Sequence, residues 1–207
     1  MFFEFSKKVK SKKVKIIFSN EQIDNIKNGK LEASMEQTHS KNVKMVDKTN
    51  LFNENTDGIF TINKDICLKV KTADCLPIFF YNESPFILGV VHAGWKGLKR
   101  GIIENAYKVI KMSIKDAASI QVLIGPSISQ KNYEVQDEFI DYFENKFIAS
   151  KNDKFFLDLK AVAKSQLMDL GITNVSDTAI CTFENEYYHS YRRDKTSKRL
   201  RGWIYYE

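Results

Sequence analysis

The side chains of this chain with the most reactive chemistry are one thiol and two imidazoles. Cys75 lies in the segment Thr-Ala-Asp-Cys-Leu-Pro, His92 is followed by Ala-Gly-Trp-Lys-Gly, and His39 ends the segment Gln-Thr-His. The whole sequence has only three histidines and three cysteines. One cysteine and two histidines make three of the four ligands of a tetrahedral zinc site, and an open fourth position is typical of a catalytic metal.

Each of these residues also has a plain structural explanation, and their wide spacing is no local metal motif. Cys75 would otherwise be a small buried hydrophobic residue, His92 a hydrogen-bonded residue at a strand end, and His39 an exposed loop residue. Pro77 fixes a strand entry close after Cys75. A predicted hairpin would bring that strand beside the one that ends at His92. From the residues alone, a metal site and a coincidence both stay open.

Charged neighbours extend the candidate site. Asp74, directly before Cys75, is a candidate for proton transfer or for orienting a metal ligand. Lys96 lies in a turn between a strand and a helix, where backbone N–H groups can face an anion. Without a metal, Cys75 would act as a nucleophile activated by His92.

A second group of reactive residues lies near the C-terminus, where aromatic residues and arginines surround His189. Arg192 and Arg193 could bind a phosphate bidentately, while neighbouring tyrosines stack on a base. A strand with cation–π packing explains the same pattern, and both interpretations stay open. Cys67 and Cys181 lie in apolar surroundings and are expected to be core residues.

Short apolar segments predict the strands that must position these groups. They occupy residues 15–18, 58–61, 66–70, 77–81, 86–91, 121–124 and 202–206. The turn at 82–85 joins two of them as a hairpin, and their continuous apolar sequences are typical of strands covered on both faces.

Helical spacing of apolar residues predicts three helices. The first begins near Gly97 and continues to residue 110, the second covers roughly 135–146, and the third covers roughly 159–170 with Gly171 as its stop. Because strands come early and helices later, we expect an α+β fold built of layers.

The length of 207 residues fits one domain over residues 1–207 with a short lysine-rich N-terminal segment. The hydrophobic content of 43% suffices for a full core. Neither a signal peptide nor an apolar run of about 18 residues is visible, and the cysteines do not form a disulfide framework. We therefore expect a cytoplasmic protein with no membrane partner.

The net charge of +6 includes a local excess of lysine at positions 7, 8, 10, 12, 13 and 15. Such a cluster can bind nucleic acid, but lysines also keep an edge strand from unwanted pairing. No helix-turn-helix or RNA-binding motif accompanies it. We expect no specific nucleic-acid partner.

Four segments occur in the same order as in a known family. They are Thr-Ala-Asp-Cys-Leu-Pro at 72–77, Val-His-Ala-Gly-Trp-Lys-Gly at 91–97, Ile-Gly-Pro at 124–126 with Tyr-Glu-Val at 133–135, and Ser-Tyr-Arg-Arg-Asp at 190–194. On these segments the chain resembles the YfiH/DUF152 family, which is described both as a polyphenol oxidoreductase (laccase) and as a purine nucleoside phosphorylase.

The resemblance implies an α+β sandwich, a layered arrangement of mixed β-sheets flanked by helices. It also implies a metal site of His39, Cys75 and His92 that holds zinc or, under the older description, copper. The implied activities are phosphorolysis of adenosine, inosine, guanosine and methylthioadenosine to base plus ribose 1-phosphate, and deamination of adenosine. Purine nucleosides and phosphate would be the partners.

The chain departs from the family pattern in four places. A short lysine-rich N-terminus stands where the family usually has a glycine- and serine-rich segment. Ser40 replaces a glycine, Ser127 a common cysteine, and Lys198 a glycine. The N-terminal difference bears on substrate contacts more than on the metal site.

The leading hypothesis is a zinc-dependent purine nucleoside enzyme. Zinc lowers the pKa of its water to about 7, so that water would displace the amino group in deamination, whereas phosphate would attack C1′ in phosphorolysis. The second hypothesis is a copper-dependent phenol oxidase, but three histidines are too few for a multicopper centre. The third is a non-enzymatic nucleic-acid-binding protein, which salt-dependent binding without nucleoside turnover would favour.

Overall fold

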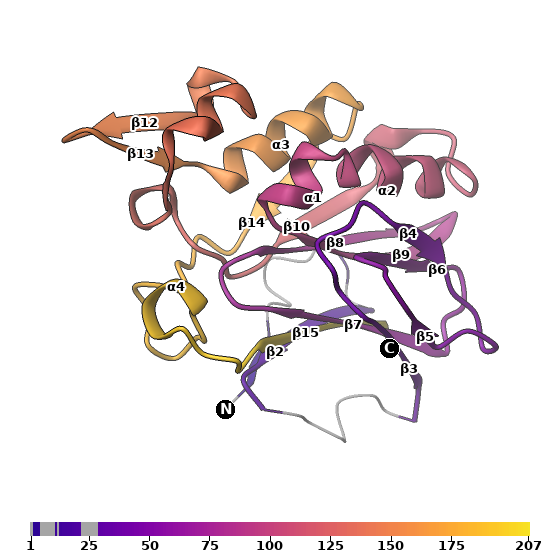
Figure 1. The fold of residues 1–207 in the computed structure, drawn as a ribbon. Coiled ribbons are helices and arrows are strands. Elements are labelled where there is room, and N and C mark those ends of the chain that lie inside the picture. The colour runs from indigo at the N-terminus through magenta and orange to yellow at the C-terminus, as the bar shows by residue number, and fades with distance from the viewer. Residues whose placement is uncertain (1, 5–10, 12, 22–28) are drawn as a thin grey trace.

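The computed structural model describes residues 2–4, 11, 13–21 and 29–207. Two six-stranded sheets lie face to face (Figure 1). The helices α1 (Trp95–Lys99), α2 (Ile102–Lys111) and α3 (Leu159–Asp169) cover the outer face of one sheet. This arrangement confirms the predicted layered α+β sandwich of mixed sheets flanked by helices.

The first sheet contains the last strand of the chain in its interior. In spatial order its strands are β1 (Phe2–Glu4), β2 (Val14–Ser19), β15 (Leu200–Tyr206), β7 (Ile66–Thr72), β3 (Leu31–Met35) and β5 (Phe52–Asn53). β15 pairs antiparallel with both β2 and β7, whereas β3 runs parallel to β7. The C-terminal strand therefore connects the N-terminal strands to the rest of the sheet.

The second sheet contains the predicted hairpin. In spatial order its strands are β14 (Asn174–Asp177), β10 (Gln121–Ile124), β8 (Leu76–Glu83), β9 (Phe86–Ala93), β6 (Gly58–Thr61) and β4 (Val43–Met45). The hairpin of β8 and β9 runs from Glu83 opposite Phe86 to Leu76 opposite Ala93. A small third sheet consists of β11 (Glu134–Val135), β13 (Lys154–Leu157) and β12 (Ile148–Lys151).

Two hydrophobic layers hold these elements together. Leu68 of β7 and Phe79 of β8 are fully buried between the two sheets. Phe80, the next residue of β8, points the opposite way and packs in the layer that contains Ile103 of α2. Because successive side chains of a strand alternate between faces, β8 and β9 are covered on both sides, which explains their continuous apolar sequences.

The first predicted helix is divided into two. α1 ends at Lys99, and Gly101 has a φ of 85° before α2 begins at Ile102. This left-handed conformation interrupts a helix, and glycine adopts it without strain. The predicted apolar face is nevertheless buried, at Leu98, Ile102, Ile103, Ala106 and Ile110.

The helix predicted over 135–146 is wrong. Val135 belongs to β11 and pairs with Phe155 of β13, and two short 3-10 helices follow, η5 (Asp137–Asp141) and η6 (Asn145–Phe147). Phe139 is buried as the pattern predicts, but its ring packs against Trp95 at a centroid distance of 4.8 Å. Tertiary pairing and aromatic packing therefore override the helical spacing in this segment.

The third predicted helix is confirmed as α3, with both of its ends accounted for. The Asp158 carboxylate accepts a hydrogen bond from the backbone N of Ala161 at 2.9 Å. Gly171 has a φ of 80°, its N donates to the carbonyl of Met168, and Ile172 N donates to that of Leu167. These two bonds form the helix-ending motif that glycine favours.

The remaining helical elements are η3 (Ala117–Ser119), η4 (Gln130–Asn132) and α4 (Tyr191–Asp194). α4 replaces the strand considered for the segment around His189. Ser190 begins it, because its Oγ accepts a hydrogen bond from the backbone N of Arg193 at 3.2 Å.

Of the N-terminal lysines, positions 7, 8, 10 and 12 lie outside the described residues. Lys15, within β2, has its Nζ 3.6 Å from Glu4 and 3.4 Å from Glu207. This lysine is therefore partly neutralised by carboxylates. In the described part of the chain, no helix is long and apolar enough to cross a membrane.

Candidate metal centre

Cys75 and His92 lie at one end of the β8–β9 hairpin. His92 is opposite Pro77, and Ala93 is opposite Leu76, the residue after Cys75. The antiparallel register therefore brings the thiol at the start of β8 beside the imidazole at the end of β9. The hairpin predicted from the sequence is what joins these two residues.

His39 reaches the pair from the loop between β3 and β4, where its φ is 57°. Three successive backbone N–H groups of this loop donate to the carboxylate of Asp57, from Thr38 at 3.1 Å, His39 at 3.1 Å and Ser40 at 2.7 Å. The Ser40 hydroxyl adds a fourth hydrogen bond at 2.7 Å. Such a cradle of N–H groups binds an anion well, so the fully buried Asp57 fixes the loop that carries His39.

The same carboxylate orients His92. Asp57 Oδ1 lies 2.8 Å from His92 Nδ1, and the Asp57 carbonyl accepts from the backbone N of His92 at 2.7 Å. Nε2 is then the nitrogen left to act as a ligand. Asp57 was not predicted as a site residue, because in the sequence it resembles a turn residue. The sequence feature that could have identified Asp57 is its position directly before β6, a strand that pairs with the strand of His92, β9.

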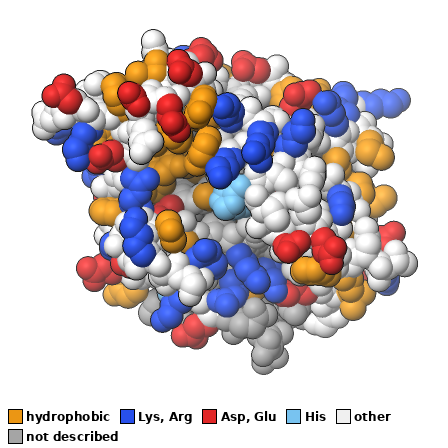
Figure 2. Space-filling view, viewed as in Figure 1, with side chains coloured by type: hydrophobic (Ala, Val, Ile, Leu, Met, Phe, Trp, Pro, Cys, Tyr) orange, Lys and Arg blue, Asp and Glu red, His pale blue; other side chains and the backbone are white. Residues whose placement is uncertain are grey.

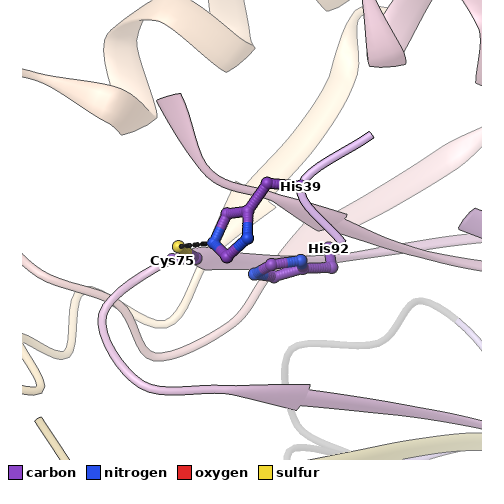
Figure 3. A group of neighbouring side chains, drawn as sticks. All are labelled: His39, Cys75 and His92. Atoms are coloured by element: carbon purple, nitrogen blue, oxygen red, sulfur yellow. Dashed lines mark hydrogen bonds between the residues drawn. The ribbon is translucent and has the colours of Figure 1, made fainter. Parts of the chain in front are cut away.

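The three side chains converge, as Figure 3 shows. Their ligand atoms all lie within 4.8 Å of one another, and Cys75 Sγ is 3.8 Å from His39 Nε2. Gly94 provides the room, because a Cβ there would lie 2.9 Å from Cys75 Sγ and 3.0 Å from His39 Cδ2. A thiolate and two imidazoles are donors that zinc prefers, so the described residues fit a three-ligand metal site with an open position.

The charges of the site favour a thiolate. Burial opposes ionisation of Cys75, but the neighbouring His92 and His39 lower the pKa of its thiol to about 6. Burial also opposes protonation of His92, while Cys75 and Asp57 raise the pKa of His92 to about 9. For Asp57, hydrogen bonds from His92 and Ser40 outweigh burial and lower the pKa to about 2. The thiolate is the form of cysteine that binds metals.

Asp74 faces away from the three candidate ligands. Its Oδ1 accepts from the Thr182 hydroxyl at 2.7 Å, and its Oδ2 accepts from the backbone N of Arg192 at 2.6 Å. Its backbone has a φ of 88°. The carboxylate therefore ties the turn before Cys75 to the start of α4.

The guanidinium of Arg193 is fully occupied by the protein. Nε and Nη2 both bond to the Asp194 carboxylate, Nη2 also donates to the Tyr188 carbonyl, and Nη1 donates to the carbonyls of Thr182 and Phe183. These bonds use all its N–H groups. Arg193 therefore has none left for a phosphate, and its contacts instead fix the segment around α4.

Arg192 and Lys96 lie in different surroundings. The Arg192 guanidinium stacks on the Tyr133 ring at 5.1 Å, and its Nη1 donates to the Glu134 carbonyl at 2.7 Å. Lys96 is exposed on α1, with its Nζ 5.6 Å from the centroid of the Trp95 ring. Arg192 thus stays available for a ligand on its remaining N–H groups.

Two cavities contain residues named above, and the candidate ligands line the first of them. The basic cavity has a volume of about 610 Å³, and its walls include Gln37, His39, Lys71, Cys75, His92 and Arg199. The aromatic cavity has a volume of about 400 Å³, and its walls include Trp95, Tyr133, Glu134, Phe139 and Arg192. Figure 2 shows a histidine beside a hollow in this face, with hydrophobic side chains to its left and lysine and arginine side chains above and below it.

The other candidate residues lie apart from this cluster. Cys67 is fully buried as expected. Cys181 is not the core residue that the sequence predicted: it is half-buried and accepts a hydrogen bond from the backbone N of Ser129 at 3.3 Å. Burial and Lys198 lower the pKa of His189. Among the described residues, His39, Cys75 and His92 form the one group of three histidine, cysteine or acidic side chains that could hold a metal ion.

Residues 5–207 match the profile of a family described as multi-copper polyphenol oxidoreductase laccase. The chain belongs to this family. It is 40% identical over 173 residues to a purine nucleoside phosphorylase of Campylobacter jejuni, covering 83% of this chain and 75% of that protein. It is 37% identical over 165 residues to one of Aquifex aeolicus, covering 79% and 77%.

Solved structures of similar proteins confirm the fold. YfiH of Bacillus licheniformis superposes with a TM-score of 0.79 at 27% identity, over 85% of this chain and 74% of that one. A DUF152 protein of Neisseria meningitidis superposes with a TM-score of 0.86 at 22% identity, over 100% and 99%. The resemblance to the YfiH/DUF152 family is thereby confirmed.

Proposed function

We propose that this chain is a zinc-dependent purine nucleoside phosphorylase that also deaminates adenosine. The observation that carries the proposal is the position of His39, Cys75 and His92 in the wall of a basic cavity. Arg192 of the aromatic cavity directly follows Tyr191, which lines the basic one. The relatives at 40% and 37% identity, both named purine nucleoside phosphorylases, support the same activity.

The donor set supports zinc as the metal. Zinc combines thiolate and imidazole ligands in tetrahedral sites, and three protein ligands leave one position open. When bound, zinc supplies a Lewis acid to an oxygen atom in the cavity. Asp57 would keep both histidines in position, and the lowered pKa of the Cys75 thiol would keep it ionised near neutral pH.

The basic cavity suits the phosphate. Gln37 fixes the backbone of Lys71 with two hydrogen bonds, of 2.9 Å to its N and 2.6 Å to its O. Lys71 and Arg199 both line the cavity and would bind the phosphate oxygens. In the reaction one of those oxygens would bond to C1′ of the ribose. The C1′–N9 bond would break, and its electron pair would leave with the base.

Asp74 enters this proposal as a positioning residue. Both of its carboxylate oxygens are bound, to Thr182 and to the backbone N of Arg192. Such bonds suit orientation of the Cys75 turn better than proton transfer. Arg192 is proposed to contact the substrate, whereas Lys96 would contribute long-range attraction for an anion.

Adenosine deamination is the second activity of the same site. Cysteine and histidine ligands with an open position are also the donors of zinc-dependent nucleobase deaminases. That shared donor set supports deamination beside phosphorolysis.

The family's multicopper description finds little support in this chain. A centre with several coppers needs many imidazoles, and the sequence has three histidines, of which the cluster uses two. Copper therefore stands as an alternative occupant of a three-ligand site, with phenol oxidation as the alternative activity.

The proposal is tested by incubating the purified protein with adenosine or inosine, with and without phosphate. Adenine, hypoxanthine, inosine and ribose 1-phosphate are followed by chromatography. We expect base release that requires phosphate, lost in Cys75→Ala and after chelation. Metal analysis of the same sample separates zinc from copper.

Two outcomes would overturn the proposal. Turnover that is undiminished in both Cys75→Ala and the chelated protein would exclude the metal site. Absence of turnover with every purine nucleoside would exclude the activity, and salt-dependent nucleic-acid binding by that inactive protein would favour the non-enzymatic alternative.

A further inference from the structure

The aromatic cavity is built from two supported rings. Trp95 lies 4.8 Å from Phe139 and stacks on Tyr142 at 6.0 Å with an interplanar angle of 3°. Tyr133 is covered by the guanidinium of Arg192 at 5.1 Å. Flat, rigid surfaces of this kind bind another flat ring by stacking.

Residues that line the aromatic cavity are neighbours in sequence of residues that contact the candidate metal ligands. Trp95 directly follows Gly94, whose Cα approaches Cys75 and His39 closely enough that a Cβ would clash with both. The backbone N of Arg192 is bound by Asp74, the neighbour of Cys75. Trp95 and Arg192, two residues of the cavity wall, are therefore held close to the candidate metal ligands.

Arg192 presents a planar edge in this cavity. Its Nη1 is bound to the Glu134 carbonyl, and within the described residues Nε and Nη2 have no hydrogen-bond partner. A guanidinium edge matches two neighbouring acceptors. Hypoxanthine and guanine offer such a pair at O6 and N7, whereas adenine offers an N6 donor beside N7.

We propose that the aromatic cavity binds the base of the nucleoside and that Arg192 makes the site prefer 6-oxopurines to adenine, an inference that rests on the proposed function. The ring stacks on Trp95, with its O6 and N7 edge toward the Arg192 guanidinium that covers Tyr133. The ribose and phosphate then extend past Cys75 into the basic cavity. Arg192 is in this way a specificity-determining residue.

Trp95 provides a direct binding signal. The chain has two tryptophans, and Trp203 is fully buried in the first sheet. The zinc-loaded protein is titrated with hypoxanthine, with adenine and with inorganic phosphate while tryptophan fluorescence is recorded. We expect saturable quenching by hypoxanthine, weaker binding of adenine and no quenching by phosphate. Trp95→Phe should abolish the quenching.

Two arginine variants form a matched pair. Arg192→Leu should weaken hypoxanthine binding about tenfold, as loss of a bidentate contact predicts, and should change adenine binding less than about threefold. Arg199→Leu should leave hypoxanthine binding unchanged and raise the KM for phosphate. If Arg192→Leu fails to fold, Gln136→Phe narrows the same cavity at an exposed position and should also weaken hypoxanthine binding.

The outcomes separate this inference from the proposed function. Quenching that persists in Trp95→Phe, or equal losses for hypoxanthine and adenine in Arg192→Leu, would overturn the inference even if nucleosides are turned over. Hypoxanthine binding at Trp95 without any nucleoside turnover would preserve the base site and overturn the phosphorylase activity.

Discussion

At the scale of single residues, Asp57 links the two histidines of the candidate metal centre. Its carboxylate accepts hydrogen bonds from the loop of His39 and from the ring of His92. Because one buried side chain makes both contacts, the positions of the two candidate ligands depend on each other.

Asp57→Asn should therefore weaken zinc binding by about tenfold or more, as is typical when a partner of a metal ligand is lost. Asparagine keeps one carbonyl acceptor but loses the charge that holds the loop. Zinc affinity is measured by competition with a chromophoric chelator. Asp65→Asn, at an exposed aspartate that pairs with Lys48, is the control and should bind zinc normally. Equal affinity in both variants would contradict the prediction.

Asp57 should also make folding sensitive to acid. Its pKa falls from an ordinary 3.8 to about 2 in the folded protein. The carboxylate therefore stabilises the folded state above about pH 4, by about 2 kcal/mol, and this contribution disappears as the pH falls through about 2. In urea unfolding without metal, the wild-type advantage over Asp57→Asn should be large near pH 6 and nearly absent near pH 2. An advantage that does not change with pH would refute this.

Gly94 is the second residue on which the site depends. Gly94→Ala should lower zinc affinity, because its Cβ would lie 2.9 Å from Cys75 Sγ. Gly97→Ala is the matched control in the same segment, where a Cβ would lie 3.3 Å from the Ser40 carbonyl oxygen. We expect a loss of about tenfold or more in the first variant and about threefold or less in the second. Similar affinities in the two variants would mean that Gly94 is not needed for ligand approach.

At the scale of elements, the strands were predicted well because their signal is local. The apolar segments at 58–61 and 121–124 coincide with β6 and β10, and the turn at 82–85 correctly predicted a hairpin. Burial on one or both faces determines such patterns, so they can be read without knowing the partner strand.

The prediction of a helix over 135–146 is wrong because contacts with distant residues determine the structure of this segment. Phe139 and Phe143 have helical spacing, yet Val135 pairs with β13 and Phe139 packs on Trp95, which lies far away in the sequence. Contacts between residues far apart in the sequence also limit how much of the candidate site can be predicted. Cys75 and His92 could be joined through a predicted hairpin, whereas the bonds of Asp57 connect the loop of His39 with β9, two segments whose proximity no local pattern encodes.

The end of α3 offers a test at this scale. Gly171 has a φ of 80°, and its N donates to the Met168 carbonyl. Gly171→Ala should destabilise the protein by about 1 kcal/mol, because a side chain disfavours this conformation. The measurement is urea unfolding, with Met168→Ala at a side chain that is 62% exposed as the control. If Met168→Ala destabilises the protein as much as Gly171→Ala does, the left-handed conformation of Gly171 is not the cause of the destabilisation.

At the scale of the whole molecule, the candidate metal centre lies at one end of the β8–β9 hairpin, and the hydrophobic core does not include its three side chains. Most of the fully buried side chains lie between the sheets and under the helices. Chelation should therefore abolish activity while leaving the far-ultraviolet circular dichroism unchanged. The melting temperature should fall only by the lost binding energy of the metal. Unfolding on chelation would show that the metal is structural.

The place of β15 has a consequence for how the chain is made. Among the described strands, β2 meets the rest of the first sheet only through β15, the final strand of the sequence. During synthesis, the strand of Ile16 and Phe18 gains its inner neighbour only after more than 180 further residues have been made. Contacts of such long sequence separation form slowly and expose apolar strands meanwhile. Until residues 200–206 have been synthesised, the edge of β2 that pairs with β15 thus stays open on the emerging chain.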